Sequence, residues 1–143
     1  MKRKLNRNIY NNLFSKQADG RYFIKMHGLE NHFVIFDGRK NPYLPDEDEI
    51  KMVCDNNLGV GADQFIILNQ PTDLGLTSGA TIFMRLLNID GLEVGACGNA
   101  TRCVAKLLMD YLNTTVIKIE TLAGVLNCDY LDDGLIQCNM GTI

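Results

Sequence analysis

The sequence contains no apolar run long enough to cross a lipid bilayer as a helix. Its first four residues are basic or methionine, but no apolar core of a signal peptide follows them. The formal net charge is only −3 over 143 residues, which gives no strong attraction to nucleic acid or to a membrane surface. These absences favour a cytoplasmic protein with no nucleic-acid or membrane partner. The chain is long enough for a domain with a hydrophobic core.

No two cysteines have the C-x-x-C spacing, so a structural zinc site has little support and we expect no bound metal. The five cysteines are an odd number and do not form a disulfide framework. If Asp132-Asp133-Gly134 is a three-residue hairpin loop, Cys128 and Cys138 oppose each other across its strands. In a reducing cytosol we expect these two thiols to remain unpaired.

Short apolar segments separated by turns predict many strands and two helices. The expected strands are at 22–26, 33–37, 65–68, 81–87, 116–121, 126–130 and 135–140, with a polar loop at 70–79. A helix with an acidic first turn is predicted from Pro45 to about Asp55. Residues 1–20 show no sustained period and are interpreted as a flexible extension, which leaves 21–143 as one domain. Because helices and strands do not alternate strictly, the predicted fold class is α+β with a mixed sheet.

A thiol stands where a glycine-asparagine turn opens the second helix, at Cys97-Gly98-Asn99. Apolar side chains downstream recur at the spacing of one helical face: Val104, Leu107, Leu108, Tyr111 and Leu112. Cys97 lies seven positions before the first of them and so projects close to that inward face. Asn99 is predicted as the N-cap, and a helix start favours an anion, either a thiolate or a substrate carboxylate. Cys97 is therefore a candidate catalytic residue, with a buried structural cysteine as the alternative.

Four stretches, in this order, resemble the N-terminal half of the diaminopimelate epimerase family: KMHGLENHFV (25–34), GVGADQ (59–64), NIDGLEV (88–94) and CGNATRC (97–103). A fifth, weaker stretch is Thr121-Leu122-Ala123-Gly124. The resemblance implies a curved mixed sheet wrapped around a central helix, which is the helix that starts at Cys97. It also implies an isomerase that interconverts LL- and meso-diaminopimelate without a metal or pyridoxal phosphate. Such an enzyme serves the synthesis of lysine and of peptidoglycan precursors.

Epimerisation of an amino acid removes the Cα proton from one face and returns a proton to the other, so an acid and a base must flank that carbon. By the resemblance, Cys97 is the first of two catalytic cysteines. The second belongs to a C-terminal domain absent from this chain, because the other four cysteines lack the matching glycine-serine context. We therefore expect the chain by itself to be inactive. Its oligomeric state is left open between a monomer and a homodimer.

Three uncharged amides, Asn31, Gln64 and Asn88, correspond by the resemblance to substrate-contacting positions. An amide can donate to a carboxylate or accept from an ammonium, which suits a zwitterionic substrate such as diaminopimelate. Gly98 and Asn99 are expected to offer backbone N–H groups and an amide to the substrate carboxylate. The alternative for each of these residues is ordinary turn or cap chemistry.

Three positions depart from the family pattern: Glu30 and Ala100 stand where glycine is usual, and His32 where aspartate is usual. Glu30 adds a negative charge beside Asn31, so it bears on the substrate-binding geometry expected there. Charged residues inside the motifs are expected to hold turns or the helix start rather than to transfer protons: Asp63, Glu93 and Arg102.

Two other functions remain open from the sequence. One is another cofactor-independent racemase or isomerase of the same superfamily, such as a proline racemase-like or phenazine-biosynthesis-like protein. The other is a non-enzymatic thiol redox module, which needs a resolving cysteine near Cys97, and Cys103 is the candidate.

Overall fold

The computed structural model describes residues 15–16, 21–28, 31–95 and 97–139, and its strands form one mixed sheet. The strands are β1 (Ser15–Lys16), β2 (Tyr22–Gly28), β3 (Asn31–Asp37), β4 (Gln64–Asn69), β5 (Ile82–Asn88), β6 (Glu93–Val94), β7 (Val116–Thr121), β8 (Gly124–Tyr130) and β9 (Ile136–Asn139). The helices are α2 (Glu47–Cys54), α3 (Asp73–Thr77) and α4 (Gly98–Leu112). None of these described helices is long and apolar enough for a membrane span.

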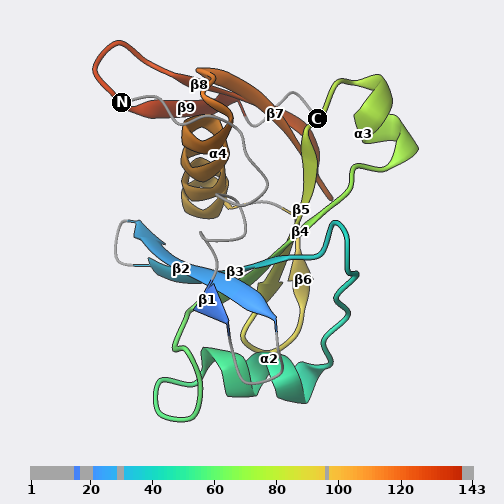
Figure 1. Cartoon of the computed structure of the whole chain (residues 1–143), viewed down its shortest axis with the longest axis vertical. Helices are drawn as coiled ribbons and strands as arrows, with labels where there is room; N and C mark the ends of the chain where they lie inside the picture. The colour runs from blue at the N-terminus through green and yellow to red at the C-terminus, as the bar shows by residue number, and fades with distance from the viewer. Residues whose placement is uncertain (1–14, 17–20, 29–30, 96, 140–143) are drawn as a thin grey trace.

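The sheet curls around α4, whereas α2 lies on its other face (Figure 1). The strand order is β1-β2-β3-β4-β5-β7-β8-β9, and β6 pairs with β5 beside this path. Two neighbouring pairs are parallel, β3 with β4 and β5 with β7, and the other pairs are antiparallel. The architecture confirms the predicted α+β class, with a curved mixed sheet around a central helix that starts next to Cys97.

The central strands are buried on both faces, which explains why their sequences are unbroken runs of apolar residues. Because successive side chains of a strand point to opposite faces, Phe33 and Ile35 of β3 pack toward α4, whereas Val34 and Phe36 pack toward α2. We call the first cluster the α4-side core; its buried members include Phe33, Ile35, Ile66, Leu68, Ile82, Met84, Leu86, Val104, Leu108 and Met109. The second, the α2-side core, includes Val34, Phe36, Tyr43, Ile50, Val53, Cys54, Phe65, Ile67 and Leu87.

The helix α2 forms where its acidic first turn predicted it. Asp46 is the N-cap, and its side chain accepts a hydrogen bond from the N–H of Glu49 at 2.8 Å. The apolar side chains of Ile50 and Val53 are buried against the sheet. The cap and the apolar face together fix both the start of the helix and the side that it buries.

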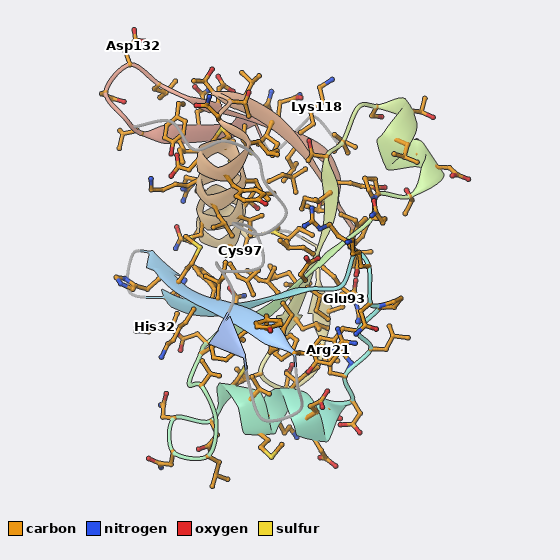
Figure 2. All side chains as sticks on the ribbon, in the orientation of Figure 1. Arg21, His32, Glu93, Cys97, Lys118 and Asp132 are labelled. Atoms are coloured by element: carbon orange, nitrogen blue, oxygen red, sulfur yellow. The ribbon has the colours of Figure 1, made fainter. Side chains whose placement is uncertain are left out.

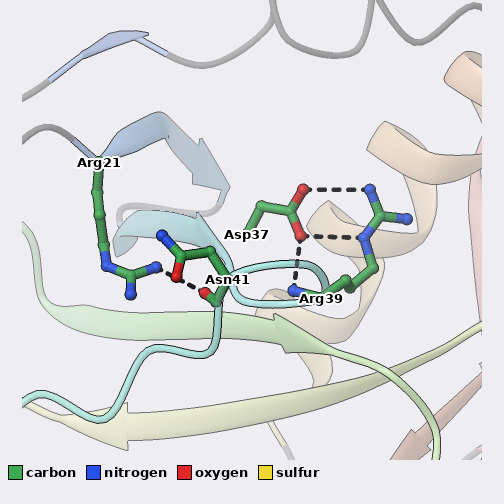
Figure 3. Close-up of polar contacts among 4 residues, drawn as sticks. All are labelled: Arg21, Asp37, Arg39 and Asn41. Carbon is green, nitrogen blue, oxygen red and sulfur yellow. Dashed lines mark hydrogen bonds and ion pairs between the residues drawn. The ribbon is translucent and has the colours of Figure 1, made fainter.

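Polar contacts anchor the segment that leads from β3 to α2 (Figure 3). Arg39 donates from Nε to Oδ1 of Asp37 at 3.0 Å and from Nη2 to Oδ2 at 3.2 Å. Arg21, at the start of β2, donates to the carbonyl oxygen of Asn41 at 2.9 Å. The Arg21 guanidinium also lies 4.1 Å from the ring centroid of Tyr43. These contacts hold the Tyr43 ring in the α2-side core.

The predicted apolar face of α4 is directed into the fold, with Val104, Leu108 and Tyr111 buried. The helix ends at Leu112, and the next residue, Asn113, has the left-handed conformation (φ 57°) typical of a C-terminal cap. The prediction of Asn99 as the N-cap is wrong. Cys97 is the N-cap, because its carbonyl oxygen accepts the first helical hydrogen bond, from the N–H of Thr101, and this places Asn99 inside the first turn.

Two further elements differ from the sequence prediction. The predicted loop at 70–79 contains α3, whose N-cap Thr72 donates its N–H to the buried carboxylate of Glu120 at 2.8 Å. Glu120 comes from β7, 48 positions away, so no local pattern indicates this support. Within the predicted extension, Ser15–Lys16 pairs with β2. The rest of that extension, 1–14 and 17–20, and Met140 of the last predicted strand lie outside the described residues.

The β8–β9 hairpin has the three-residue loop predicted at Asp132-Asp133-Gly134. The N–H of Leu131 donates to the carbonyl oxygen of Leu135 at 2.8 Å, and Gly134 adopts a positive φ of 83°. Cys128 and Cys138 are Cα partners across the two strands, which confirms that they oppose each other. All five cysteines are free thiols.

Candidate active site

Cys97 immediately precedes α4, and its thiol lies at the margin of the α4-side core. Its backbone is extended (φ −140°, ψ 125°), and its carbonyl oxygen accepts from both the N–H and the hydroxyl of Thr101, at 2.9 and 2.8 Å. Thr101 is fully buried, so the double contact fixes the residue that carries the thiol. Cys97 lies near the middle of the molecule, where α4 begins close to β2 and β3 (Figure 2). The residue is half-buried.

Arg102 folds back over the first turn of α4. Its Nη2 donates to Oδ1 of Asn99 at 2.7 Å, and its Nη1 lies 3.2 Å from where a Cβ on Gly98 would be. Glycine at this position therefore leaves room for the guanidinium. No side chain of the described residues caps the helix start, so its N–H groups remain available to an anionic ligand. Because the Asn99 oxygen is engaged by Arg102, its NH₂ is the part available to such a ligand.

The three predicted amides lie at one end of the sheet. Asn31 begins β3, Gln64 begins the parallel strand β4, and Asn88 ends the antiparallel strand β5. The residues two positions along the same strands belong to the α4-side core: Phe33, Ile66 and Leu86. Because side chains alternate along a strand, all three amides project to the face that α4 covers.

The side chains of Gln64 and Asn88 form a pair. The two residues are Cα partners in the β4–β5 ladder, and Nε2 of Gln64 donates to Oδ1 of Asn88 at 3.2 Å. The other amide atom of Gln64, Oε1, is buried and has no hydrogen-bond partner among the described residues. A buried acceptor is normally satisfied, so this oxygen suits a ligand that brings a donor, such as an ammonium group.

A short connection joins Asn88 to the start of α4. The N–H of Gly91 donates to the Asn88 carbonyl at 2.9 Å, and Gly91 has the positive φ (88°) that this tight turn requires. The chain then returns along β5 as β6, and Gly95 follows it. A Cβ on Gly95 would be 3.7 Å from Cβ of Ala123, in the turn between β7 and β8. The fifth family-like stretch, 121–124, therefore lies beside the loop that leads into α4.

The second turn of α4 packs on the β2–β3 hairpin. A Cβ on Gly28 would be 3.0 Å from Sγ of Cys103, and Gly28 is the Cα partner of Asn31. This contact places the first half of α4 over the end of the sheet that carries the amides. Burial raises the pKa of the Cys103 thiol, and the nearby Arg102 guanidinium partly offsets this effect. Glu30, which departs from the family pattern, lies outside the described residues.

Asp63 and Glu93, two acidic residues of the motifs, have partners within the fold. Asp63 and His32 exchange two hydrogen bonds at 2.8 Å, from the Asp63 N–H to the His32 carbonyl and from the His32 N–H to the Asp63 carboxylate. The His32 contribution comes from its backbone, so the departure from aspartate at this position leaves the contact intact. Glu93 forms an ion pair with Nε of Arg85 at 3.1 Å.

Together these elements place a thiol, free N–H groups of a helix start and three amides on one face of the sheet. Within the described part of the chain, no group of three or more His, Cys, Asp or Glu side chains is placed to hold a metal ion. Such a set of groups can hold an amino-acid zwitterion and exchange a proton with it. Sequence reasoning missed the support that Thr101 gives to Cys97. The feature of the sequence that could have indicated this support is a hydroxyl-bearing residue four positions after the cysteine, which is the spacing of about one helical turn.

A family model described as diaminopimelate epimerase matches residues 23–143. The curated diaminopimelate epimerase of Rhodospirillum centenum is 43% identical over 121 residues, which cover 85% of this chain and 40% of that protein. The corresponding protein of Acidiphilium cryptum is 41% identical over 124 residues, 87% of this chain and 43% of that protein. The chain thus spans less than half the length of these relatives.

Among solved structures, a hydroxyproline epimerase from Agrobacterium vitis with bound trans-4-hydroxy-L-proline is similar, with a TM-score of 0.59. The match has 16% sequence identity and covers 81% of this chain and 40% of that one. At this identity the likeness concerns the fold alone.

Proposed function

The chain belongs to the diaminopimelate epimerase family, and from this premise we propose that it provides one half of the active site of an enzyme that interconverts LL- and meso-diaminopimelate. The reaction would serve the synthesis of lysine and of peptidoglycan precursors in the cytoplasm. One observation carries the proposal. Cys97 begins the helix that lies on the sheet face to which Asn31, Gln64 and Asn88 project.

Substrate binding follows from the charges of an α-amino acid. Its carboxylate would lie at the start of α4, where free N–H groups and the NH₂ of Asn99 can donate to it. Its ammonium would donate to the buried Oε1 of Gln64, the acceptor that has no partner among the described residues. Asn31 and Asn88 can donate or accept at the same end of the sheet. These contacts would direct the Cα–H bond of the substrate toward or away from Cys97, depending on its configuration.

The chemical step needs one proton carrier on each side of Cα. Cys97 would act as one carrier, removing the Cα proton in one direction and returning a proton in the other. Donors at the helix start would stabilise the negative charge that develops on the carboxylate when the proton leaves. This mechanism uses side chains and backbone N–H groups of the protein, without a metal or pyridoxal phosphate.

The second carrier would come from another domain. Cys54 lies in the α2-side core, on the opposite face of the sheet, and Cys128 is buried in the α4-side core. Burial raises the pKa of Cys54, and the neighbouring Cys138 thiol together with burial raises that of Cys128, which disfavours the thiolate needed for proton exchange. We therefore propose that a C-terminal domain contributes the second cysteine, and that the 143-residue chain assayed by itself does not epimerise diaminopimelate.

A chimeric enzyme tests this function. The chain would replace the corresponding N-terminal part of the Rhodospirillum centenum relative, and conversion of LL-diaminopimelate would be followed with a dehydrogenase specific for the meso isomer. We expect turnover by the chimera and none by the chain alone. Proline and hydroxyproline, assayed by polarimetry, serve as control substrates for the wider superfamily. A folded chimera that is inactive on diaminopimelate, or a chain that is fully active alone, would contradict the proposal.

A further inference from the structure

The β8–β9 hairpin brings together two free thiols that the proposed mechanism does not use. Cys128 and Cys138 are Cα partners across the strands, and neither forms a disulfide. Cys128 is only 1% exposed, whereas Cys138 is half-buried at the margin of the α4-side core. One member of the pair is therefore partly exposed to solvent, and the other is buried.

The backbone geometry favours a bond between the two sulfurs. The N–H of Tyr130 donates to the carbonyl oxygen of Thr115, the residue directly before β7. Antiparallel hydrogen-bonded pairs recur at every second residue, so Cys128, which is the partner of Ile117, also directs its N–H and C=O toward β7. These backbone groups therefore do not point toward β9, and Cys128 and Cys138 form a non-hydrogen-bonded pair of the β8–β9 ladder. The Cα atoms of such a pair are about 4.5 Å apart, within the range of about 4.4–6.8 Å that a disulfide spans.

The thiols already interact. The neighbouring Cys128 thiol, with a smaller contribution from the Arg102 guanidinium, lowers the pKa of Cys138. The neighbouring Cys138 thiol and burial raise the pKa of Cys128. The partly exposed thiol of Cys138 is thus the one that deprotonates more readily, and the buried Cys128 thiol lies opposite it across the two strands.

We propose that Cys128 and Cys138 are a redox-active pair that a hydroperoxide converts into a cross-strand disulfide. The Cys138 thiolate attacks the peroxide and breaks its O–O bond, which gives a Cys138 sulfenic acid and hydroxide. The Cys128 thiol then attacks the sulfenic sulfur; the S–S bond forms, and the departing hydroxyl leaves with the Cys128 proton as water. The first hydroxide takes up the proton that Cys138 had lost. Two electrons pass from the sulfurs to one hydrogen peroxide, and two waters form.

The disulfide would stiffen the part of the sheet that covers α4. The strand β9 contacts α4. The Arg102 guanidinium, which contributes to the lowered pKa of Cys138, also donates a hydrogen bond to Asn99 in the first turn of α4. A cross-link between β8 and β9 restricts the unfolded chain more than the native hairpin, in which the two residues already face each other. We therefore expect the oxidised chain to have a higher Tm than the reduced chain.

Peptide mapping tests the proposal directly. Trypsin leaves both cysteines in one peptide, 119–143, because no lysine or arginine follows Lys118. A second digestion before aspartates cuts at Asp129, Asp132 and Asp133, so only a disulfide then holds the two cysteine pieces together. After brief treatment with hydrogen peroxide we expect this linked species, the loss of two titratable thiols per chain, and the rise in Tm, all reversed by dithiothreitol.

Matched variants identify the pair. Cys138→Ser and Cys128→Ala should each abolish the linked species, whereas Cys54→Ser, in the other core, should leave it unchanged. Because the buried substitution at 128 risks loss of folding, the variant at the half-buried position 138 is the decisive one. A linkage between Cys97 and Cys103 in place of this one, or two free thiols at 128 and 138 after peroxide has oxidised Cys97, would overturn the proposal.

Discussion

The two hydrophobic cores lie on opposite faces of the same strands, but they differ in composition and in what borders them. The α2-side core is built on aromatic rings: Phe36 stacks on Phe65 with centroids 4.9 Å apart, and Tyr43 meets Phe36 at 5.0 Å. The α4-side core is mostly aliphatic, and half-buried cysteines lie at its margin: Cys97, Cys103 and Cys138. One face is closed by packing, and the other leaves polar and reactive groups within reach of solvent.

Because of this difference, residues of a single strand can serve two purposes: those on one face stabilise the fold, and those on the other face contribute to the proposed site. Phe65 and Ile66 are neighbours on β4, yet they belong to different cores, and Gln64 at the start of the strand projects to the α4 side. A tightly packed aromatic face can therefore support the sheet while the opposite face carries a site. Substitutions on the two faces should consequently affect different measurements.

The largest expected effect is the loss of the proton carrier on the α4 side. In the chimeric enzyme, Cys97→Ala should lower kcat by about a thousandfold or more, because positioned acid–base groups contribute about 10²–10⁴ in rate. Turnover and deuterium incorporation at Cα should fall together. Cys54→Ala, on the other face of the sheet, is the control and should retain turnover. Near-normal activity of the Cys97 variant would remove this residue from the mechanism.

A substitution in the α2-side core should lower stability and leave the thiol chemistry unchanged. Phe65 is fully buried, and truncation of such a ring to alanine costs about 3–5 kcal/mol of unfolding free energy. Urea denaturation of Phe65→Ala measures this cost, with Phe65→Leu as a milder variant in case the first does not fold. Tyr22→Ala, at a half-exposed ring on β2, is the control. If the folded Phe65 variants alter the alkylation rate of Cys97, the two faces are not independent.

The thiols of the two faces should differ in reactivity. Burial, with a contribution from Asp63, raises the pKa of Cys54 from 9.0 to about 11, so its thiolate fraction at pH 8 is about a hundredfold lower than that of an unshifted thiol. Its alkylation should accelerate with pH up to about 11, since deprotonation creates the nucleophile. Iodoacetamide labelling followed by mass spectrometry should therefore modify Cys97 and Cys138 well before Cys54. Early labelling of Cys54 would show that the α2-side core opens readily.

The smallest effect concerns the buried acceptor on Gln64. In the chimera, Gln64→Leu should raise KM by about tenfold to a hundredfold, because a hydrogen bond to a charged group contributes about 1.5–3 kcal/mol. The change in kcat should be smaller than that of the Cys97 variant. Gln137→Ala, on an exposed position of β9, is the control. An unchanged KM would mean that the ammonium does not bind at this oxygen.

Elements whose cause is local could be predicted from the sequence. The apolar spacing of α4, the acidic start of α2 and the short segment that forms β7 all depend on residues close together in the chain, and all three elements formed as predicted. The residues of the four family-like stretches could also be identified from the sequence, because these stretches occur along the chain in the same order as in the family. The N-cap was assigned two positions too late, because an asparagine suits a cap by type, whereas the first helical hydrogen bond depends on where the chain enters the helix.

What only the tertiary structure decided is which distant residues meet. The register of β4 with β5 pairs Gln64 with Asn88 and leaves one amide oxygen unsatisfied, and no pattern within either segment contains that information. The support of α3 by Glu120 and the curl that sets α4 over the three amides also depend on contacts far apart in the chain. Local sequence sets the period and ends of each element, but burial of both sheet faces selects the register, and the register assembles the site.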